Sequence, residues 1–356
     1  MRIDEPLRIG LAIPRQGPGG IFGPSCEAVA ELAASQLNAR HGILEREVVI
    51  EVIDAGGSVQ ETQRNVVAAI QEDRAHAITG WHISSVREHL APVLARYGVP
   101  YVYTSLHEGA RTPGVLSTGE TPADQMTPGL EWLRREFGVR RWAIVGADYI
   151  WPRETARSIR RHADATGLEI VHESFVRYGC RDFGAVLGEL STARAQGVVM
   201  LLVGRDAVLF NRQFAAAGLQ DHLIRFTPLM EENMLLASGE DAVHELYVAA
   251  AYFNTLATPS ALDFAGAYGA EFGFDAPALN NAAESCYEGI LALAAAAEHA
   301  RSLDVRSLLS SASEGVSYEG PRGLVTLSEG GTRQRVHIAR ADRFEFDVLA
   351  SFGGVP

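Results

Sequence analysis

The sequence predicts an α/β protein built from two doubly wound lobes that are joined by a three-stranded hinge. Short apolar, β-branched runs alternate with longer segments of helical periodicity, which is typical of repeated β-α units. This alternation runs for about 110 residues and then starts again, and 356 residues are more than one ordinary core holds. Pro and small polar residues interrupt the apolar runs near Ser117–Ala123 and Tyr252–Pro259, and a third passage near Tyr318–Gly323 is expected to return the tail to the second lobe.

The first lobe follows directly from the N-terminus. Apolar runs predict strands over Leu7–Ile13, Val48–Ile53, Ala77–Gly80 and Pro100–Tyr103. Between them, apolar residues at helical spacing predict helices over Pro24–Arg40, Val59–Glu72 and Ser84–Tyr97.

The second lobe repeats the pattern and ends in a different kind of segment. The predicted strands are Arg141–Val145, Glu169–Phe175, Gly197–Val203, Leu223–Phe226 and Leu246–Tyr252. The predicted helices are Pro122–Phe137, Pro152–Thr166, Phe183–Ala193 and Arg205–Ala217. Beyond the second passage, helices are predicted over Ser260–Phe272 and Asn280–Ala300. In the tail, turns at Glu329–Gly331 and Ala341–Asp342 separate three expected antiparallel strands, Gly323–Leu327, Gln334–Ala339 and Phe344–Leu349.

The three segments where the chain is expected to cross between the sheets determine which residues belong to each lobe. We expect residues 1–120 plus 254–320 to form the N-terminal lobe and residues 121–253 plus 321–356 to form the C-terminal lobe. Three crossings make a hinge, with a ligand cleft between the lobes that can close round a small molecule.

Composition excludes several classes of function. The net charge of −13 disfavours nucleic-acid binding, which needs a basic face to displace counterions from phosphates. All 31 basic residues are Arg, so a Schiff-base lysine and a P-loop lysine are both impossible. Cys26, Cys180 and Cys286 are too widely spaced for a zinc motif or a disulfide framework. We therefore expect neither a metal nor a cofactor.

Localisation stays open at this stage. The first residues enter an apolar strand at once, without the charged and apolar regions of a signal peptide, and no apolar run is long enough to span a membrane. The protein is expected to be cytoplasmic if Met1 is the native start, and periplasmic or otherwise extracytoplasmic if a leader was removed.

Three strand ends carry hydroxyls and aromatic rings and lead directly into a helix or turn. They lie within residues 77–85, 99–105 and 142–152. In open α/β sheets, ligands sit beyond the carboxyl ends of the strands, so these segments are expected to face one cleft. No nucleophile with an adjacent base stands among them, which favours a site that holds a molecule over one that breaks it.

Eight segments spread over nearly the whole chain have a familiar order and spacing: 8–14, 33–44, 80–87, 107–109, 146–154, 252–253, 258–259 and 318–325. Through them the chain resembles the type I periplasmic-binding-protein fold, in its branched-chain amino acid, urea and short-chain amide binding branch. The most specific segment is Asp148-Tyr149-Ile150-Trp151-Pro152-Arg153-Glu154, which is very similar to a segment of the amide sensor of bacterial amidase operons and of urea-binding transport proteins. The resemblance implies ligand binding without catalysis. The Gly-rich loop at 14–20 and Leu106 depart from the amide sensors and leave the ligand's identity open.

Candidate ligand contacts in the first lobe come from the strand ends. Ser84 and Ser85 open a helix, so a serine there can cap it, or the free amides can bind a carboxylate or carbonyl oxygen. The resemblance places Ser84 at a ligand position and Ser105 at the family's second hydroxyl position. Tyr103 either stacks on the ligand or belongs to the core. His82 stands where amide binders often carry an aromatic residue, or is a surface histidine.

Candidate contacts in the second lobe are fewer. The resemblance places Tyr149 at the family's aromatic position, and Trp151 either lines the pocket or packs in the core. Glu231, or Glu232 beside it, could pair with a ligand ammonium, although acids at a helix start are also favoured by the helix dipole. Asp206 either caps a helix or binds ligand.

We therefore predict non-catalytic binding of a small polar ligand, a short-chain amide, urea or amino acid, in an interlobe cleft that closes by a hinge. Two roles compete: a solute-binding protein that serves an ABC permease, and a cytoplasmic sensor that acts on a regulatory partner. A homodimer is left open. The alternative from another class is a hydrolase acting on small amides, with His107 and either Glu108 or Glu154.

Overall fold

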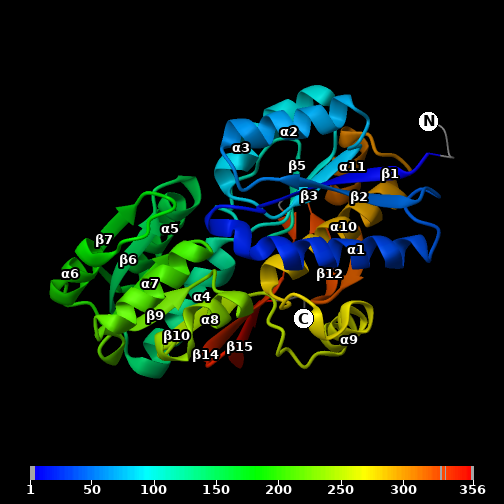
Figure 1. The fold of residues 1–356 in the computed structure, drawn as a ribbon. Coiled ribbons are helices and arrows are strands. Elements are labelled where there is room, and N and C mark those ends of the chain that lie inside the picture. Colours follow the sequence, from blue (N-terminus) through cyan, green and yellow to red (C-terminus); the bar gives the residue numbers. More distant parts are fainter. Residues whose placement is uncertain (1–4, 329–330, 333, 354–356) are drawn as a thin grey trace. The chain divides into compact units, whose positions relative to one another are not determined.

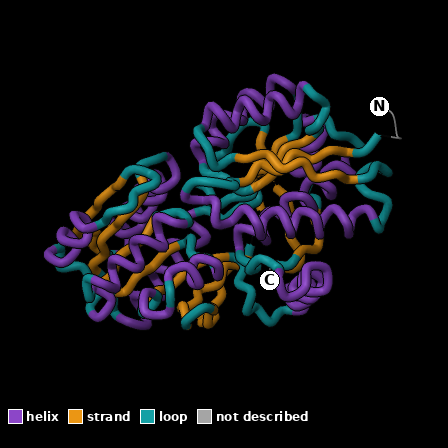
Figure 2. Tube along the Cα trace, viewed as in Figure 1, coloured by secondary structure: helices purple, strands orange, loops and turns teal. Residues whose placement is uncertain are grey.

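The fold described here is that of a computed structural model, which describes residues 5–328, 331–332 and 334–353. The chain divides into two compact units. Unit 1 comprises Met1–Leu106, Ala110–Gly119 and Ala257–Arg333, and unit 2 comprises His107–Gly109, Glu120–Leu256 and Gln334–Pro356. In each unit a layer of strands is covered by helices (Figure 2).

The main sheet of unit 1 has five parallel strands in the order β2-β1-β3-β4-β5. These strands are β1 (Leu7–Ile13), β2 (Val48–Asp54), β3 (Ala77–Gly80), β4 (Tyr101–Tyr103) and β5 (Val115–Ser117). The helices are α1 (Gly23–Asn38), α2 (Val59–Gln71), α3 (Ser84–Tyr97), α9 (Pro259–Phe272), α10 (Asn281–Ala300) and α11 (Val305–Ser313), with 3-10 turns at Pro18–Phe22 and Gly273–Asp275. Helices α2 and α3 pack together on one face of the sheet, and α1 packs along α10 on the other (Figure 1).

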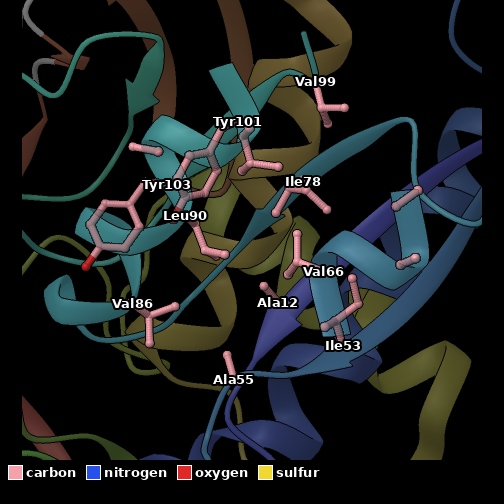
Figure 3. Close-up of a cluster of buried hydrophobic side chains, with 14 residues drawn as sticks. Ala12, Ile53, Ala55, Val66, Ile78, Val86, Leu90, Val99, Tyr101 and Tyr103 are labelled. Atoms are coloured by element: carbon pink, nitrogen blue, oxygen red, sulfur yellow. The ribbon is translucent and has the colours of Figure 1, made fainter. Parts of the chain in front are cut away.

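The face of this sheet under α2 and α3 forms a continuous apolar core. Its side chains include Ile53, Val66, Ile78 and Leu90, together with the two tyrosines of β4 (Figure 3). Because residues two apart in a strand share a face, Tyr101 and Tyr103 both enter this core. Their phenol groups must find partners there, since a buried hydroxyl without a hydrogen bond is costly.

Unit 2 contains a seven-stranded mixed sheet in the order β15-β14-β10-β9-β8-β6-β7. Its strands are β6 (Arg141–Ala147), β7 (Glu169–Val176), β8 (Gly197–Leu201), β9 (Ile224–Thr227), β10 (Leu246–Ala250), β14 (Arg335–Asp342) and β15 (Glu345–Gly353). Its helices are α4 (Pro122–Phe137), α5 (Ile150–Thr166), α6 (Gly184–Thr192), α7 (Arg205–Ala216) and α8 (Glu232–Ser238), with 3-10 turns at Leu219–Asp221 and Glu240–Ala242. Strands β6 to β10 are parallel, and β14 and β15 add an antiparallel edge.

The tail differs from the expected division. Residues 317–332 form an antiparallel sheet, β11 (Ser317–Gly320), β12 (Gly323–Ser328) and β13 (Gly331–Thr332), within unit 1. The segment Tyr318–Gly323, expected to be a passage, is instead a hairpin, and the division between units comes after Arg333. Of the turn expected at Glu329–Gly331, Glu329 and Gly330 lie outside the described residues.

A buried ion cluster holds this hairpin in unit 1. The Nε of Arg322 lies 3.1 Å from Glu284 Oε1 on α10, and an Nη of Arg322 lies 2.5 Å from Glu288 Oε2. Tyr318 also donates its hydroxyl to Glu288 at 3.2 Å. Breaking a buried pair leaves an unpaired charge, which costs several kcal/mol (about 3–5), so the hairpin stays with α10.

Candidate ligand-binding site

In unit 1 the candidate site begins where β3 ends and α3 starts. Gly80 has φ of 134°, and a Cβ at this position would lie 2.4 Å from the carbonyl oxygen of Ala12 on the neighbouring strand. Only glycine allows this close approach, which lets the chain leave the sheet and turn through Trp81, His82 and Ile83 into the helix.

Hydroxyl groups from β4 and the loop after it fix that turn. The Oγ of Ser105 accepts from the His82 amide at 2.9 Å and donates to the His82 carbonyl at 2.8 Å. Tyr103 donates its hydroxyl to the same carbonyl at 2.8 Å. The Oη of Tyr101 lies 2.9 Å from Nε2 of His82. Of the four residues that make up this network, His82, Tyr103 and Ser105 were candidate ligand contacts, and Tyr101 was not.

His82 lies inside this network, not at the surface. Its side chain is 1% exposed, and its ring lies 5.1 Å from that of Tyr103. Burial lowers the pKa of His82 to about 3, because the charged imidazolium would lose its hydration. The ring is therefore neutral near pH 7, with Nε2 beside the Tyr101 hydroxyl and Nδ1 3.4 Å from the carbonyl oxygen of Ile83.

The start of α3 leaves donors without acceptors. Ile83 occupies the N-cap position and has no polar side chain, while the amides of Val86 and Arg87 turn back to its carbonyl. Within the described residues nothing accepts from the amides of Ser84 and Ser85, or pairs with Ser84 Oγ, although Ser84 is only 1% exposed. Unpaired amides at the positive end of a helix attract an anion or a carbonyl oxygen.

In unit 2 the candidate residues follow successive parallel strands. Tyr149 comes after β6 and is the N-cap residue of α5, and Trp151 is buried in the first turn of that helix. The ring of Tyr149 lies 6.3 Å from that of Trp151 and 5.7 Å, edge to face, from that of Tyr178, which follows β7. Tyr178 was not predicted as a site residue. Its place directly after a strand, before Gly179, is the signal that could have identified it.

Asp206 joins this group from the start of α7. It is fully buried, and its Oδ2 accepts from the amide of Gly179, next to Tyr178, at 2.7 Å. Burial raises the pKa of Asp206 to about 6, partly offset by this bond and by the positive charge of Arg205. Within the described residues, Asp206 Oδ1 and Arg205 Nε are buried and have no hydrogen-bond partner. Buried polar atoms are normally satisfied, so two exceptions side by side need an explanation.

The two glutamates after β9 have different roles. Glu231 is the buried N-cap residue of α8. Glu232 is 6% exposed, and its Oε1 accepts from the amide of Asn254 at 2.8 Å. Burial, reinforced by the negative charge of Glu345, raises the pKa of Glu232 to about 7. Glu232 is therefore engaged with the backbone, and which of the two glutamates contacts a ligand stays a prediction.

The structure thus gathers the candidates into two groups, one in each unit. His82, Ser84, Ser105 and Tyr103 meet at the ends of β3 and β4, and Ser85 stands half-buried beside them. In unit 2 the loop carrying Tyr178 and Gly179 links Tyr149 and Trp151 to Asp206. Glu231 follows the neighbouring strand β9.

The hydrolase alternative finds no support in the geometry. His107 Nδ1 accepts from the amide of Gly109 at 3.1 Å, and Glu154 pairs with Arg157 on the surface of α5. Among the described residues there is no group of His, Cys, Asp and Glu side chains placed to hold a metal ion. The three cysteines are free thiols. In the described part of the chain, no helix has the length and apolar character needed to cross a membrane.

Comparisons with known proteins agree on one family. Residues 6–343 match the periplasmic binding protein family. A Leu/Ile/Val-binding protein homologue of Brucella melitensis is 24% identical over 91% of this chain and 88% of its own length.

Solved structures share the fold. A solute-binding protein of an ABC transporter from Rhodopseudomonas palustris BisB5, in complex with 3,4-dihydroxybenzoic acid, has a TM-score of 0.86 at 22% identity and covers 98% of both chains. A branched-chain amino acid transporter substrate-binding protein from Streptococcus pneumoniae, in complex with isoleucine, has a TM-score of 0.85 at 16% identity, and the match covers 99% of this chain and 100% of that chain. The two-lobed α/β fold and the absence of catalysis expected from the sequence are thereby confirmed, and the chain belongs to the periplasmic binding protein family of non-enzymatic small-molecule binders.

Proposed function

We propose that this protein is the solute-binding component of an ABC importer, works outside the cytoplasm, and delivers a small polar ligand to a membrane permease. The family membership and the ABC-transporter relatives support this role over that of a cytoplasmic sensor. Each unit carries its own group of candidate ligand contacts, and a ligand stabilises whichever conformation of the protein it binds more tightly.

One observation carries the proposal: in each unit a buried polar atom at a predicted ligand position has no partner among the residues that the structure describes. Ser84 Oγ and the first amides of α3 offer donors, whereas Asp206 Oδ1 offers an acceptor. An oxygen acceptor on a ligand would satisfy the donors at Ser84, and a donor on a ligand would satisfy Asp206. Amino acids, short-chain amides and hydroxybenzoates all meet this requirement.

The positive charge of Arg205 beside Asp206 limits which ligand group can bind at this position. A ligand ammonium would pair with Asp206 but would be repelled by Arg205, whose Nε would still lack an acceptor. A carboxylate would satisfy Arg205 but repel Asp206. A neutral group that both donates and accepts, such as a primary amide, satisfies the two side chains together. We therefore place an amide ahead of an amine at this position, with Glu231 as the acid that would favour an amino acid instead.

A thermal-unfolding screen tests the proposal. The panel contains urea, propionamide, L-leucine, L-glutamine and 4-hydroxybenzoate. Propionate, an anion that only accepts hydrogen bonds, and propylamine, a cation that only donates them, are the controls. A bound compound at 100 times its Kd adds about 2.7 kcal/mol to the stability of the folded protein. Propionamide raising Tm, while propionate and propylamine do not, supports the amide. A panel without any shift contradicts the proposed ligand class.

A further inference from the structure

The sequence presents Ser105 and Tyr103 as ligand contacts, and their hydrogen bonds give them a different role. A serine or tyrosine hydroxyl has a single hydrogen to donate. The hydrogens of Ser105 and of Tyr103 both go to the carbonyl oxygen of His82, each at 2.8 Å. Neither residue can donate to a ligand carboxylate or carbonyl oxygen without giving up this bond.

These hydrogen bonds meet at the backbone of a single residue of the turn, His82. Ser105 Oγ also accepts from the amide of His82, so one hydroxyl satisfies both polar groups of that residue. Beneath the turn, the neutral ring of His82 is held by Tyr101 and packs against Tyr103. The turn is therefore tied from its backbone and from its side chain, and all of these ties come from β4 and the residues just after it.

The residues next along the chain are the ones left with unpaired groups. Ser84 and Ser85 follow the tied residue by two and three positions, and their amides and Ser84 Oγ find no acceptor within the described residues. Binding groups that are already in position cost less to order when the ligand arrives. A fixed turn also prevents these amides from relaxing toward internal acceptors.

We infer that Ser105, with Tyr103, is a positioning residue that fixes the turn at His82, and that Ser84 Oγ and the first amides of α3 are the groups that bind the ligand's oxygen. This inference rests on the proposed function, because it assigns roles within the same half-site. It separates two serines that occupy similar positions in the sequence: Ser84 touches the ligand, and Ser105 acts through the backbone of His82.

The test compares Ser105→Ala, Ser105→Thr and Ser84→Ala by two measurements. Hydrogen exchange of the His82 amide in the ligand-free protein reports the turn. Calorimetric titration with propionamide, L-leucine and 4-hydroxybenzoate reports binding. Ser105→Ala is expected to speed exchange at His82 and to weaken each ligand that binds by about tenfold, the worth of one buried hydrogen bond. Ser105→Thr keeps the hydroxyl and is expected to restore both readings.

Ser84→Ala supplies the opposite pattern. It should weaken the same ligands while leaving exchange at His82 unchanged, because Ser84 makes no bond to the turn. If Ser105→Ala weakens binding without changing exchange at His82, Ser105 is a contact and the inference is overturned. Should Ser105→Ala not fold, Tyr103→Phe removes one of the two bonds to the His82 carbonyl and gives the same readout. If none of the three compounds binds the wild type, the proposed function fails, while the exchange measurement still decides the role of Ser105.

Discussion

Glu232→Gln tests how the buried acid next to the candidate site affects stability. The pKa of Glu232 rises from an ordinary value of 4.5 to about 7, first because burial strips the carboxylate of water and then because Glu345 repels it. Each pKa unit corresponds to about 1.4 kcal/mol, so this shift amounts to about 3 kcal/mol. Gln keeps an oxygen that can accept from the amide of Asn254 and removes the buried charge.

The direction of the pH dependence follows from where the proton binds. A carboxyl whose pKa is higher in the folded protein than in the unfolded chain holds its proton longer when folded. Its ionisation therefore costs stability, and this cost grows as the pH rises from about 4.5 to about 7. Glu232→Gln escapes that cost. The unfolding free energy of Glu232→Gln should match that of the wild type at pH 4.5 and exceed it by up to about 3 kcal/mol at pH 8. Any cost of burying the Gln amide group without an acceptor lowers the stability of the variant at both pH values.

Urea unfolding of both proteins at pH 4.5 and pH 8 measures the difference, followed by signals from unit 2 because a chain of two units need not unfold in one step. Glu136→Gln, at an exposed position of α4, is the matched control and should show no pH-dependent difference. A Glu232→Gln effect that stays equal at the two pH values would refute the reasoning, because it would mean that the folded protein does not penalise the charge.

Three further predictions concern neighbouring residues. Asp206→Asn should weaken the binding of donor-bearing ligands by about tenfold to a hundredfold. The affinity of the wild type should also decline as the pH falls through about 6, because Asp206 takes up a proton there. Calorimetry from pH 5 to 8 checks both effects, and a wild-type affinity that does not change with pH would exclude Asp206 as the acceptor. Because the pKa of His82 falls to about 3, its contribution to stability is present above pH 6.5 and is lost as the pH drops toward 3. The difference in unfolding free energy between the wild type and His82→Phe should therefore change by about 3 kcal/mol between pH 6.5 and pH 4. An unchanged difference would mean that the ring is protonated in the folded protein. Gly80→Ala should lower Tm far more than Gly98→Ala, because its Cβ would meet the Ala12 carbonyl whereas Gly98 has open space; equal losses would count against the close approach at Gly80.

The repeating β-α pattern was enough to predict most of the fold, because each long helix and each central strand shows its own periodicity in the sequence. Strand β3 and helix α3 have the bounds expected from sequence. The elements that were missed are short or edge elements, such as β5 and α11, whose few apolar residues are set by contacts distant in the chain. The hairpin at Gly320 was mistaken for a passage for the same reason, since Arg322 is held by glutamates more than 30 residues earlier.

The positions of the candidate site residues could be predicted from the sequence, but the role of each residue could not. Strand ends and helix starts are local features, so Ser84, Ser105, Tyr149 and Asp206 could be selected from sequence. Which hydroxyl keeps its hydrogen for a ligand depends on what lies opposite it in space: Ser105 faces the backbone of His82, and Ser84 faces no described partner. The same holds for the glutamates, where Asn254 engages Glu232 from a strand away. A hydroxyl at a strand end is therefore a ligand contact only when the fold leaves its hydrogen unused, and counting donated hydrogens distinguishes the two roles.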